Sequence, residues 1–232
     1  MYRTDYKRYK PSVADFDKKC LKDIYSLGVK FFIGQFAGLV VFNSSSIIIS
    51  HFINPTETAI YNSAWTYFGV LVIFNNMLLQ PIITAVTDAY VKRELDWIKG
   101  AFGKLRLYNV GLTIVSVLML LVSPFVFKIW LGGKLLIPLS LSIVMSIYFI
   151  LNIWVSPYWA FLSGVGKLDI SLLLALFKIV AFIPAALLMI KKFDTVGMVA
   201  AIIIINTLPN FIFGIIQYRK IVNDKARGIW NK

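Results

Sequence analysis

The sequence predicts an all-α membrane protein that folds as a bundle of six transmembrane helices. Of the 232 residues, 59% are hydrophobic and 15% are charged, whereas about a quarter of the residues in an ordinary globular domain are charged. The hydrophobic residues gather into six runs, each long enough to cross a bilayer core about 30 Å thick. All eleven Asp and Glu residues fall outside these runs. The runs cover residues 31–53, 64–86, 107–127, 135–155, 170–190 and 196–216.

Two other classes of fold explain these runs less well. Six buried helices of this length in a soluble protein would leave too little polar surface to cover the core. A membrane barrel needs strands of about ten residues that alternate between apolar and polar side chains, and the run at 200–205, Ala-Ala-Ile-Ile-Ile-Ile, does not alternate. The first thirty residues are polar and charged, so we expect no cleaved signal peptide.

The positive charges alternate along the chain and predict its orientation. The net charge is +13, and 19 of the 24 Lys and Arg fall in residues 1–30, 87–106, 156–169 and 217–232. The alternate connections hold four, and Lys178 lies within a run. Cytoplasmic segments are the ones enriched in Lys and Arg, so both termini are expected in the cytoplasm. The basic segments should bind anionic lipid headgroups, and no nucleic-acid partner is needed to explain the charge.

Three segments lie outside the runs and have their own character. Residues 1–30 read as a basic cytoplasmic leader, and residues 217–232 as a basic cytoplasmic tail. Residues 88–106 place apolar side chains on one helical face, which predicts an amphipathic helix on the cytoplasmic surface or a helical extension of its neighbours. That face carries Val91, Leu95, Ile98, Phe102 and Leu105.

Polar residues within the first two runs are the first candidates for a binding site. Such residues are costly in lipid unless they face protein or water. Two stripes on neighbouring helices would suit a solvated cavity, although hydrogen bonds between helices are the alternative explanation. The first stripe comprises Gln35, Asn43, Ser46 and Ser50, and the second comprises Asn76, Gln80, Thr84 and Asp88.

Lys178 is the one charged residue within the runs. Its position, about nine residues into the fifth run, allows two interpretations. The ammonium group could reach the interface along its flexible stem, or it could face a cavity and attract an anionic ligand.

The sequence offers no catalytic constellation and suggests no cofactor or metal. It contains one His and one Cys, and no carboxylate lies within a run. A membrane transferase would normally need an acid or a His near its reaction centre. We therefore do not expect an enzyme.

Several short motifs, in this order and spacing, resemble one known family over nearly the whole chain. Each motif is weak alone, and the ordered set is more specific. The chain resembles the C-terminal half of a bacterial polysaccharide flippase, the translocase of O-antigen or capsule repeat units in the MATE-like superfamily. The motifs are SLGVKFF at 26–32, IIIS at 47–50, Pro55 with Tyr61 and Asn62, DAY at 88–90, WI at 97–98, KIW at 128–130, GVGK at 164–167 and KARGIW at 225–230.

This resemblance implies two six-helix lobes around a central cavity in the bacterial inner membrane, with alternating access. It implies an undecaprenyl-pyrophosphate-linked oligosaccharide as cargo, and Lys30 as a candidate contact for the pyrophosphate or sugars. The chain would supply the second lobe, and residues 1–30 would link the lobes. Its partner would then be a missing N-terminal lobe, a separately encoded half or a second copy.

The chain departs from the family pattern at two positions. Many members have Trp where this chain has Ile83, and Asn where it has Ser163. Such changes could alter contacts with sugars or mark a chain that no longer transports. The alternatives to a polysaccharide flippase are a drug exporter, a flippase for peptidoglycan precursors, a membrane enzyme of the same pathway and a nonfunctional fragment.

Overall fold

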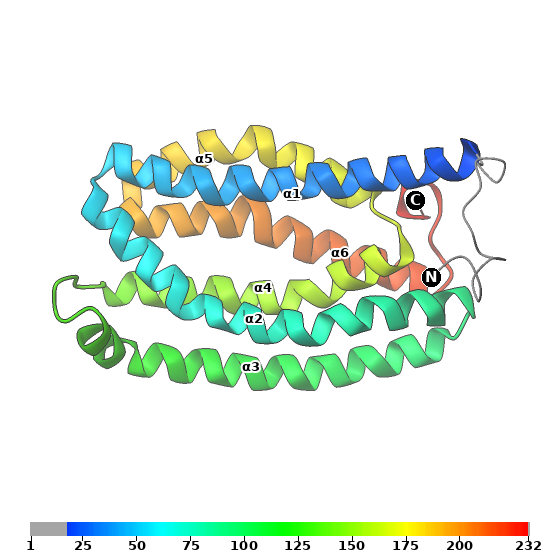
Figure 1. Ribbon diagram of the computed structural model, residues 1–232, viewed down its shortest axis with the longest axis horizontal. Helices are drawn as coiled ribbons and strands as arrows, with labels where there is room; N and C mark the ends of the chain where they lie inside the picture. The colour runs from blue at the N-terminus through cyan, green and yellow to red at the C-terminus, as the bar shows by residue number, and fades with distance from the viewer. Residues whose placement is uncertain (1–17, 232) are drawn as a thin grey trace, which may run out of the picture.

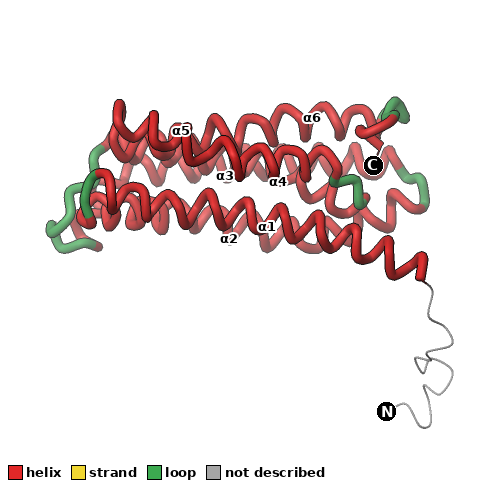
Figure 2. Tube along the Cα trace, turned by 90° about the horizontal axis from the view of Figure 1, so that it is seen from above, coloured by secondary structure: helices red, strands yellow, loops and turns green. Residues whose placement is uncertain are grey.

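A computed structural model describes residues 18–231, with side chains from Tyr25 onward, and contains no β-strand in that range (Figure 1). Its long helices lie side by side along one axis, as Figure 2 shows from above. The fold is therefore a helical bundle, as the apolar runs predict. The helices are α1 (Lys18–Phe52), α2 (Pro55–Val91), α3 (Leu95–Trp130), α4 (Leu139–Val165), α5 (Asp169–Ile202), the π-helical turn η3 (Ile203–Thr207), α6 (Leu208–Val222) and the 3₁₀ turn η4 (Gly228–Asn231).

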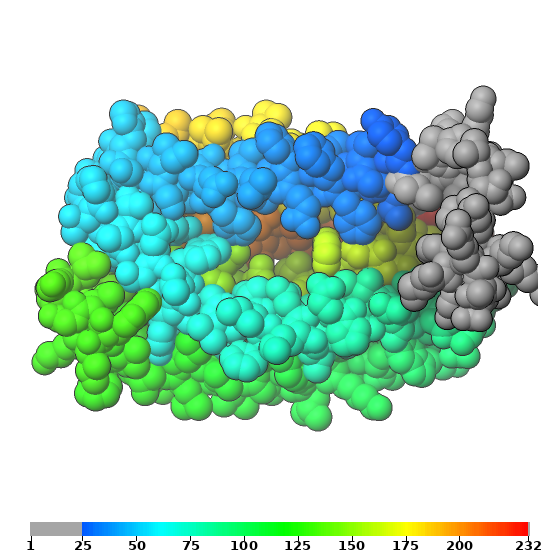
Figure 3. Space-filling model, viewed as in Figure 1, coloured from blue at the N-terminus to red at the C-terminus, as the bar shows by residue number. Residues whose placement is uncertain are grey.

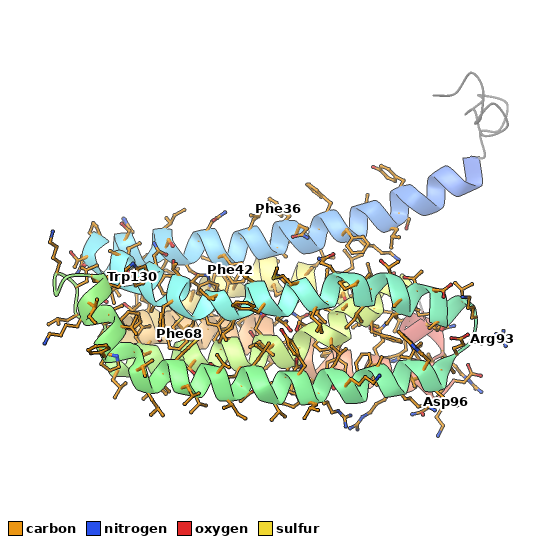
Figure 4. All side chains as sticks on the ribbon, turned by 60° about the horizontal axis from the view of Figure 1, so that its bottom comes forward. Phe36, Phe42, Phe68, Arg93, Asp96 and Trp130 are labelled. Carbon is orange, nitrogen blue, oxygen red and sulfur yellow. The ribbon has the colours of Figure 1, made fainter. Side chains whose placement is uncertain are left out.

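The connections divide between the two ends of the bundle. The start of α1, the turn from α2 to α3 and the C-terminal segment lie at one end (Figure 1). Arg93 and Asp96 lie at this end, and Trp130 lies at the opposite end (Figure 4). The described parts of the basic segments, which the charge pattern assigns to one side of the membrane, thus gather at one end of the molecule.

Local sequence explains where two of the helices begin and end. The Asn54 side chain accepts a hydrogen bond of 2.7 Å from the backbone N–H of Glu57, and Pro55 takes the first helical position of α2. Both features favour a helix start. Gly166 ends α4 with a φ of 72°, a left-handed conformation that glycine adopts without a steric penalty. Gly166 of the GVGK motif is thus the C-terminal cap of α4.

Two large apolar clusters and a small third one, formed by Leu79, Leu105 and Ala160, hold the helices together. α2 packs mainly on α4, and α1 packs mainly on α5. The first cluster joins α1, α2, α4 and α5 through aromatic residues such as Phe68 and Phe149, with ring centroids 6.4 Å apart. The second lies nearer the basic end, where Phe102 of α3 stacks on Tyr218 of α6 at 4.1 Å. Along α2, Leu71 belongs to the first cluster and Val86 to the second, which leaves Asn76 between them.

The outer surface of the bundle is apolar, as expected for contact with lipid. Five helical stretches of the described chain are long and apolar enough to cross a membrane. α3 exposes Leu107, Leu121 and Phe125, each to more than 60%. Exposed apolar surface on this scale is rare in soluble proteins, whereas lipid tails accommodate it. The stretches are Tyr25–Phe52, Pro55–Val91, Leu95–Trp130, Leu139–Val165 and Asp169–Val222.

The last of these stretches, Asp169–Val222, breaks at Phe193 and Asp194, which have non-helical backbone angles. A Cβ on Gly197 would collide with the carbonyl group of Met189, although eight residues of straight helix would place the two about 12 Å apart. In Figure 1 the chain runs out along α5 and returns towards α6. The break is therefore a tight turn between two helical arms.

The helix bounds bear on three segments outside the runs. α1 already begins at Lys18, so residues 18–30 are helical, while residues 1–17 of the expected leader lie outside the described range. Of the two alternatives for residues 88–106, the structure has the helical extension of the neighbours, because α2 extends to Val91 and α3 starts at Leu95. α6 continues to Val222, so residues 217–222 belong to the bundle and not to a tail.

The apolar face of residues 95–106 explains why these residues are part of α3. Ile98, Phe102 and Leu105 are buried against other helices. Their face is thus used for packing at the basic end of the bundle, and Val91 remains exposed. Hydrophobic periodicity identifies the buried face, but not whether lipid or protein covers it.

Candidate functional site

A polar cavity of about 400 Å³ lies inside the bundle and opens between α1 and α2. Figure 3 shows this side, which is hollowed between α1 and α2, with later helices visible behind. Gln35 reaches the cavity from α1, Val72 and Asn76 line it from α2, and the remaining lining comes from α4, α5 and α6. The other lining residues with polar side-chain atoms are Asn152, Ser156, Trp159, Ser171, Asn210 and Gln217.

A second, smaller cavity of about 190 Å³ adjoins the first. Gln35, Trp159, Ser171 and Asn210 line both, as a comparison of the two linings shows. The second cavity adds Lys30 of α1 and Lys178 of α5. The two cavities therefore form one cleft with a neutral compartment and a cationic compartment.

Lys178 lies on α5 and is half-buried. Its side chain contacts the helical arm that follows the turn at Phe193 and Asp194. Its Nζ donates a hydrogen bond of 3.1 Å to Oδ1 of Asn206. Within the described side chains, residues 25–231, no carboxylate pairs with it. Lys178 therefore supplies a cation to the cleft. The amide oxygen of Asn206 holds this ammonium group in place, and no acidic group among the described side chains neutralises it.

The π-helical turn η3 puts Asn206 opposite Lys178. Pro209 cannot donate a backbone hydrogen bond, and in a regular helix its ring would clash with the carbonyl group four residues earlier. The backbone widens here, and the N–H of Leu208 bonds to the carbonyl group of Ile203, five residues back. The Asn210 side chain donates to the Asn206 carbonyl oxygen at 2.8 Å. Such π-turns are frequent at functional sites.

Lys30 forms an ion pair with Asp169, the first residue of α5. A carboxylate at a helix N-terminus is favoured by the helix dipole, and both side chains of the pair are about one-quarter exposed or less. Lys30 thus lines the cleft, but its charge is already balanced. Lys178 is better suited than Lys30 to attract an anion.

The structure brings four of the ten predicted site residues into the cleft: Lys30, Gln35, Asn76 and Lys178. Ser46 instead donates a hydrogen bond to Asn62 at 3.2 Å. Four others are exposed and line neither cavity: Asn43, Ser50, Gln80 and Thr84.

Asp88, the last predicted site residue, lies near the basic end of α2. Its carboxylate accepts a hydrogen bond of 2.7 Å from Lys92, and this bond raises the pKa of Lys92. The ion pair is exposed to solvent and lines neither cavity. Asp88 therefore belongs to the polar end of the bundle.

Some polar residues of the runs form hydrogen bonds between helices, and one of their partners, Ser156, also lines the cleft. Asn75 donates a hydrogen bond of 2.6 Å to Ser156, and Ser116 bonds to Ser146 at 3.0 Å. These bonds are the interhelical contacts that the sequence left open as an alternative to a cavity.

The polar stripes of the first two runs did not predict the polar residues that the later helices contribute to the cleft. A signal was present on the last arm, because positions 206, 210 and 217 are separated by four and seven residues and share one helical face. Most of the cleft lining therefore comes from α4, α5 and α6, where the sequence predicted only Lys178. The missed residues are Asn152, Ser156, Ser171, Asn206, Asn210 and Gln217.

Fold and cleft together define an all-helical, multi-pass membrane protein with a polar, partly cationic interior. Residues 1–87 match the family described as polysaccharide biosynthesis protein. The chain is also 27% identical over 158 residues, or 66% of its length, to a Yersinia pseudotuberculosis protein named for O-antigen export. Both matches confirm the resemblance to a polysaccharide flippase-like family. No solved structure gives a significant match.

The matched region spans 35% of the length of the Yersinia protein. The relative's name assigns export, and not a chemical transformation, to the longer protein. At a coarse level, these similarities connect the chain with polysaccharide export.

Proposed function

We propose that this chain is one half of a transporter that moves a lipid-linked oligosaccharide across the bacterial inner membrane. The observation that carries the proposal is the cleft, which places a cation and several amides inside an otherwise apolar bundle. A lipid-linked sugar carries an anionic phosphate group and hydroxyl groups, and the cleft offers contacts of both kinds. The apolar outer surface would leave the lipid tail in the bilayer.

The proposed topology has six crossings, with both termini in the cytoplasm. The turn at Phe193 and Asp194 divides the last apolar stretch into two antiparallel arms, which supports six crossings instead of five. The concentration of Lys and Arg at the end that holds both described termini supports the orientation. At this end the basic side chains would contact anionic headgroups.

Cysteine labelling tests this topology. In a Cys20→Ala background, Thr56→Cys and Lys192→Cys should react with a membrane-impermeant reagent added outside the cell, and Glu94→Cys should not. All three positions are exposed, so access depends on the side of the membrane. If position 94 alone were labelled from outside, the orientation would be the reverse of the one proposed. If positions 56 and 192 were labelled from opposite sides, the proposal of six crossings would be wrong.

The proposed partner covers the open side of the cleft. Asn43, Ser50, Gln80 and Thr84 lie exposed on α1 and α2, and polar groups are costly against hydrocarbon. Alternating access also requires one bundle to move against another. A missing N-terminal lobe, a separately encoded half or a second copy would supply the opposite wall.

Crosslinking and reconstitution together test the need for a partner. In the Cys20→Ala background, Thr84→Cys should crosslink to a partner polypeptide in membranes, and Leu121→Cys on the lipid-facing side of α3 should not. Vesicles that hold only this chain as a monomer should not flip a fluorescent lipid-linked oligosaccharide, and addition of the crosslinked partner should restore flipping. Flipping by the monomer, or crosslinking from position 121 alone, would contradict the proposal.

The competing functions make different predictions in the same vesicles. An enzyme of the pathway would hydrolyse or transfer the glycan, and a drug exporter would move cationic dyes and leave the glycan lipid in place. A nonfunctional fragment would form no partner complex. The export name of the relative and the cleft without an acidic group favour transport.

A further inference from the structure

The larger cavity is uncharged, although the protein is strongly basic. Of its fifteen lining residues, none is Lys, Arg, Asp or Glu. Amide and hydroxyl side chains each donate and accept hydrogen bonds, which matches the hydroxyl groups of a sugar. Lys30 and Lys178 line only the smaller compartment. The cleft thus separates an anion-attracting region from a neutral one.

Gln217 lines the neutral compartment and has an unused hydrogen-bond acceptor. The residue is fully buried, at 0% exposed, and its Nε2 donates to the carbonyl oxygen of Lys167 at 3.2 Å. Its Oε1 has no hydrogen-bond partner within the described chain. A buried acceptor without a donor is unfavourable, so a ligand hydroxyl group at this position would be stabilised.

Trp159 provides a flat apolar surface beside these polar groups. It lines both compartments and is 43% exposed. The electron-rich face of an indole attracts the weakly positive C–H groups on one face of a pyranose ring. A ring stacked on Trp159 would direct its hydroxyl groups at the amides around it.

We propose that the neutral compartment is a subsite for one uncharged sugar ring, with Trp159 as its platform and Gln217 Oε1 as the acceptor for one hydroxyl group. The proposal rests on the proposed function and adds a specificity to it: the sugar held here carries no carboxylate. An ionised carboxylate in this compartment would be buried without a cationic partner, which is unfavourable.

Binding of simple glycosides to the full chain in lipid nanodiscs tests the subsite. The probes are methyl glucoside and methyl glucuronide, which share a ring and differ in charge, and binding is followed by saturation-transfer NMR. The parent chain should bind the glucoside at millimolar concentrations and the glucuronide at least about tenfold more weakly. Trp159→Ala should lose glucoside binding, Trp159→Phe should retain most of it, and Trp97→Ala, an exposed Trp outside the cleft, should bind like the parent.

Deoxy derivatives of methyl glucoside test Gln217 separately. One of them should bind more weakly than the glucoside to the parent, and this difference should disappear in Gln217→Leu. No binding by the parent, tighter binding of the glucuronide, or equal losses in Trp159→Ala and Trp97→Ala would overturn the proposal. If the chain bound the glucoside but its complex with the partner did not flip the lipid-linked oligosaccharide, the proposed function would be wrong. The subsite would still be supported.

Discussion

Gly197→Ala is expected to destabilise the chain by about 3 kcal/mol or more. The added Cβ would collide with the backbone carbonyl group of Met189 across the turn at Phe193 and Asp194. A backbone group cannot rotate away as a side chain can, so the two arms of the turn must separate. The hydrogen bond of 2.8 Å from Thr195 to Glu57, which ties this turn to the start of α2, should be lost with it.

The fraction of correctly folded protein after heating in detergent, measured by size-exclusion chromatography, reports this loss. Gly111→Ala is the matched control, because its Cβ would have nothing within 4 Å. It should be neutral or slightly stabilising, since Ala favours a helix over Gly by about 1 kcal/mol. Equal stability of the two variants would mean that the arms at the turn do not approach as closely as the structure shows.

Lys178→Met is expected to reduce transport about tenfold or more without lowering the amount of folded protein. A hydrogen bond to a charged group contributes about 1.5–3 kcal/mol, and every 1.4 kcal/mol changes an equilibrium about tenfold. Met has a similar shape and removes the charge. The loss should therefore fall on the anionic group of the cargo and not on packing, and Asn206 would lose its donor from Lys178.

Flipping of a labelled lipid-linked oligosaccharide, measured in vesicles that contain both halves of the transporter, tests this expectation. Lys178→Arg should retain part of the activity because the positive charge remains. Lys191→Met is the control, since Lys191 is exposed and lies near the turn at Phe193 and Asp194, outside the cleft. Transport by Lys178→Met at the parent rate would show that the cation does not contact the cargo.

The polar stripe of α2 shows why the site was predicted only in part. Residues four apart on a helix with 3.6 residues per turn are offset by about 40°. Over the three steps from Asn76 to Asp88 the stripe therefore turns by about 120°. Asn76 faces the cavity, whereas Gln80 and Thr84 have turned out of it. A spacing of four identifies neighbours on a helix, but it does not fix which helix they face.

Hydropathy by itself determined the class of the protein and located its long apolar helices, because an apolar helix of about 20 residues is stable across a bilayer. It did not determine the helix ends, since residues 18–30 and 95–106 are polar enough for water and still helical.

Only the tertiary structure decided which polar groups meet. The turn at Phe193 and Asp194 and the π-turn before Pro209 bring Lys178 beside Asn206, 28 residues later in the chain. Burial of a polar group depends on the helices packed around it, and a single segment of sequence carries no information about them.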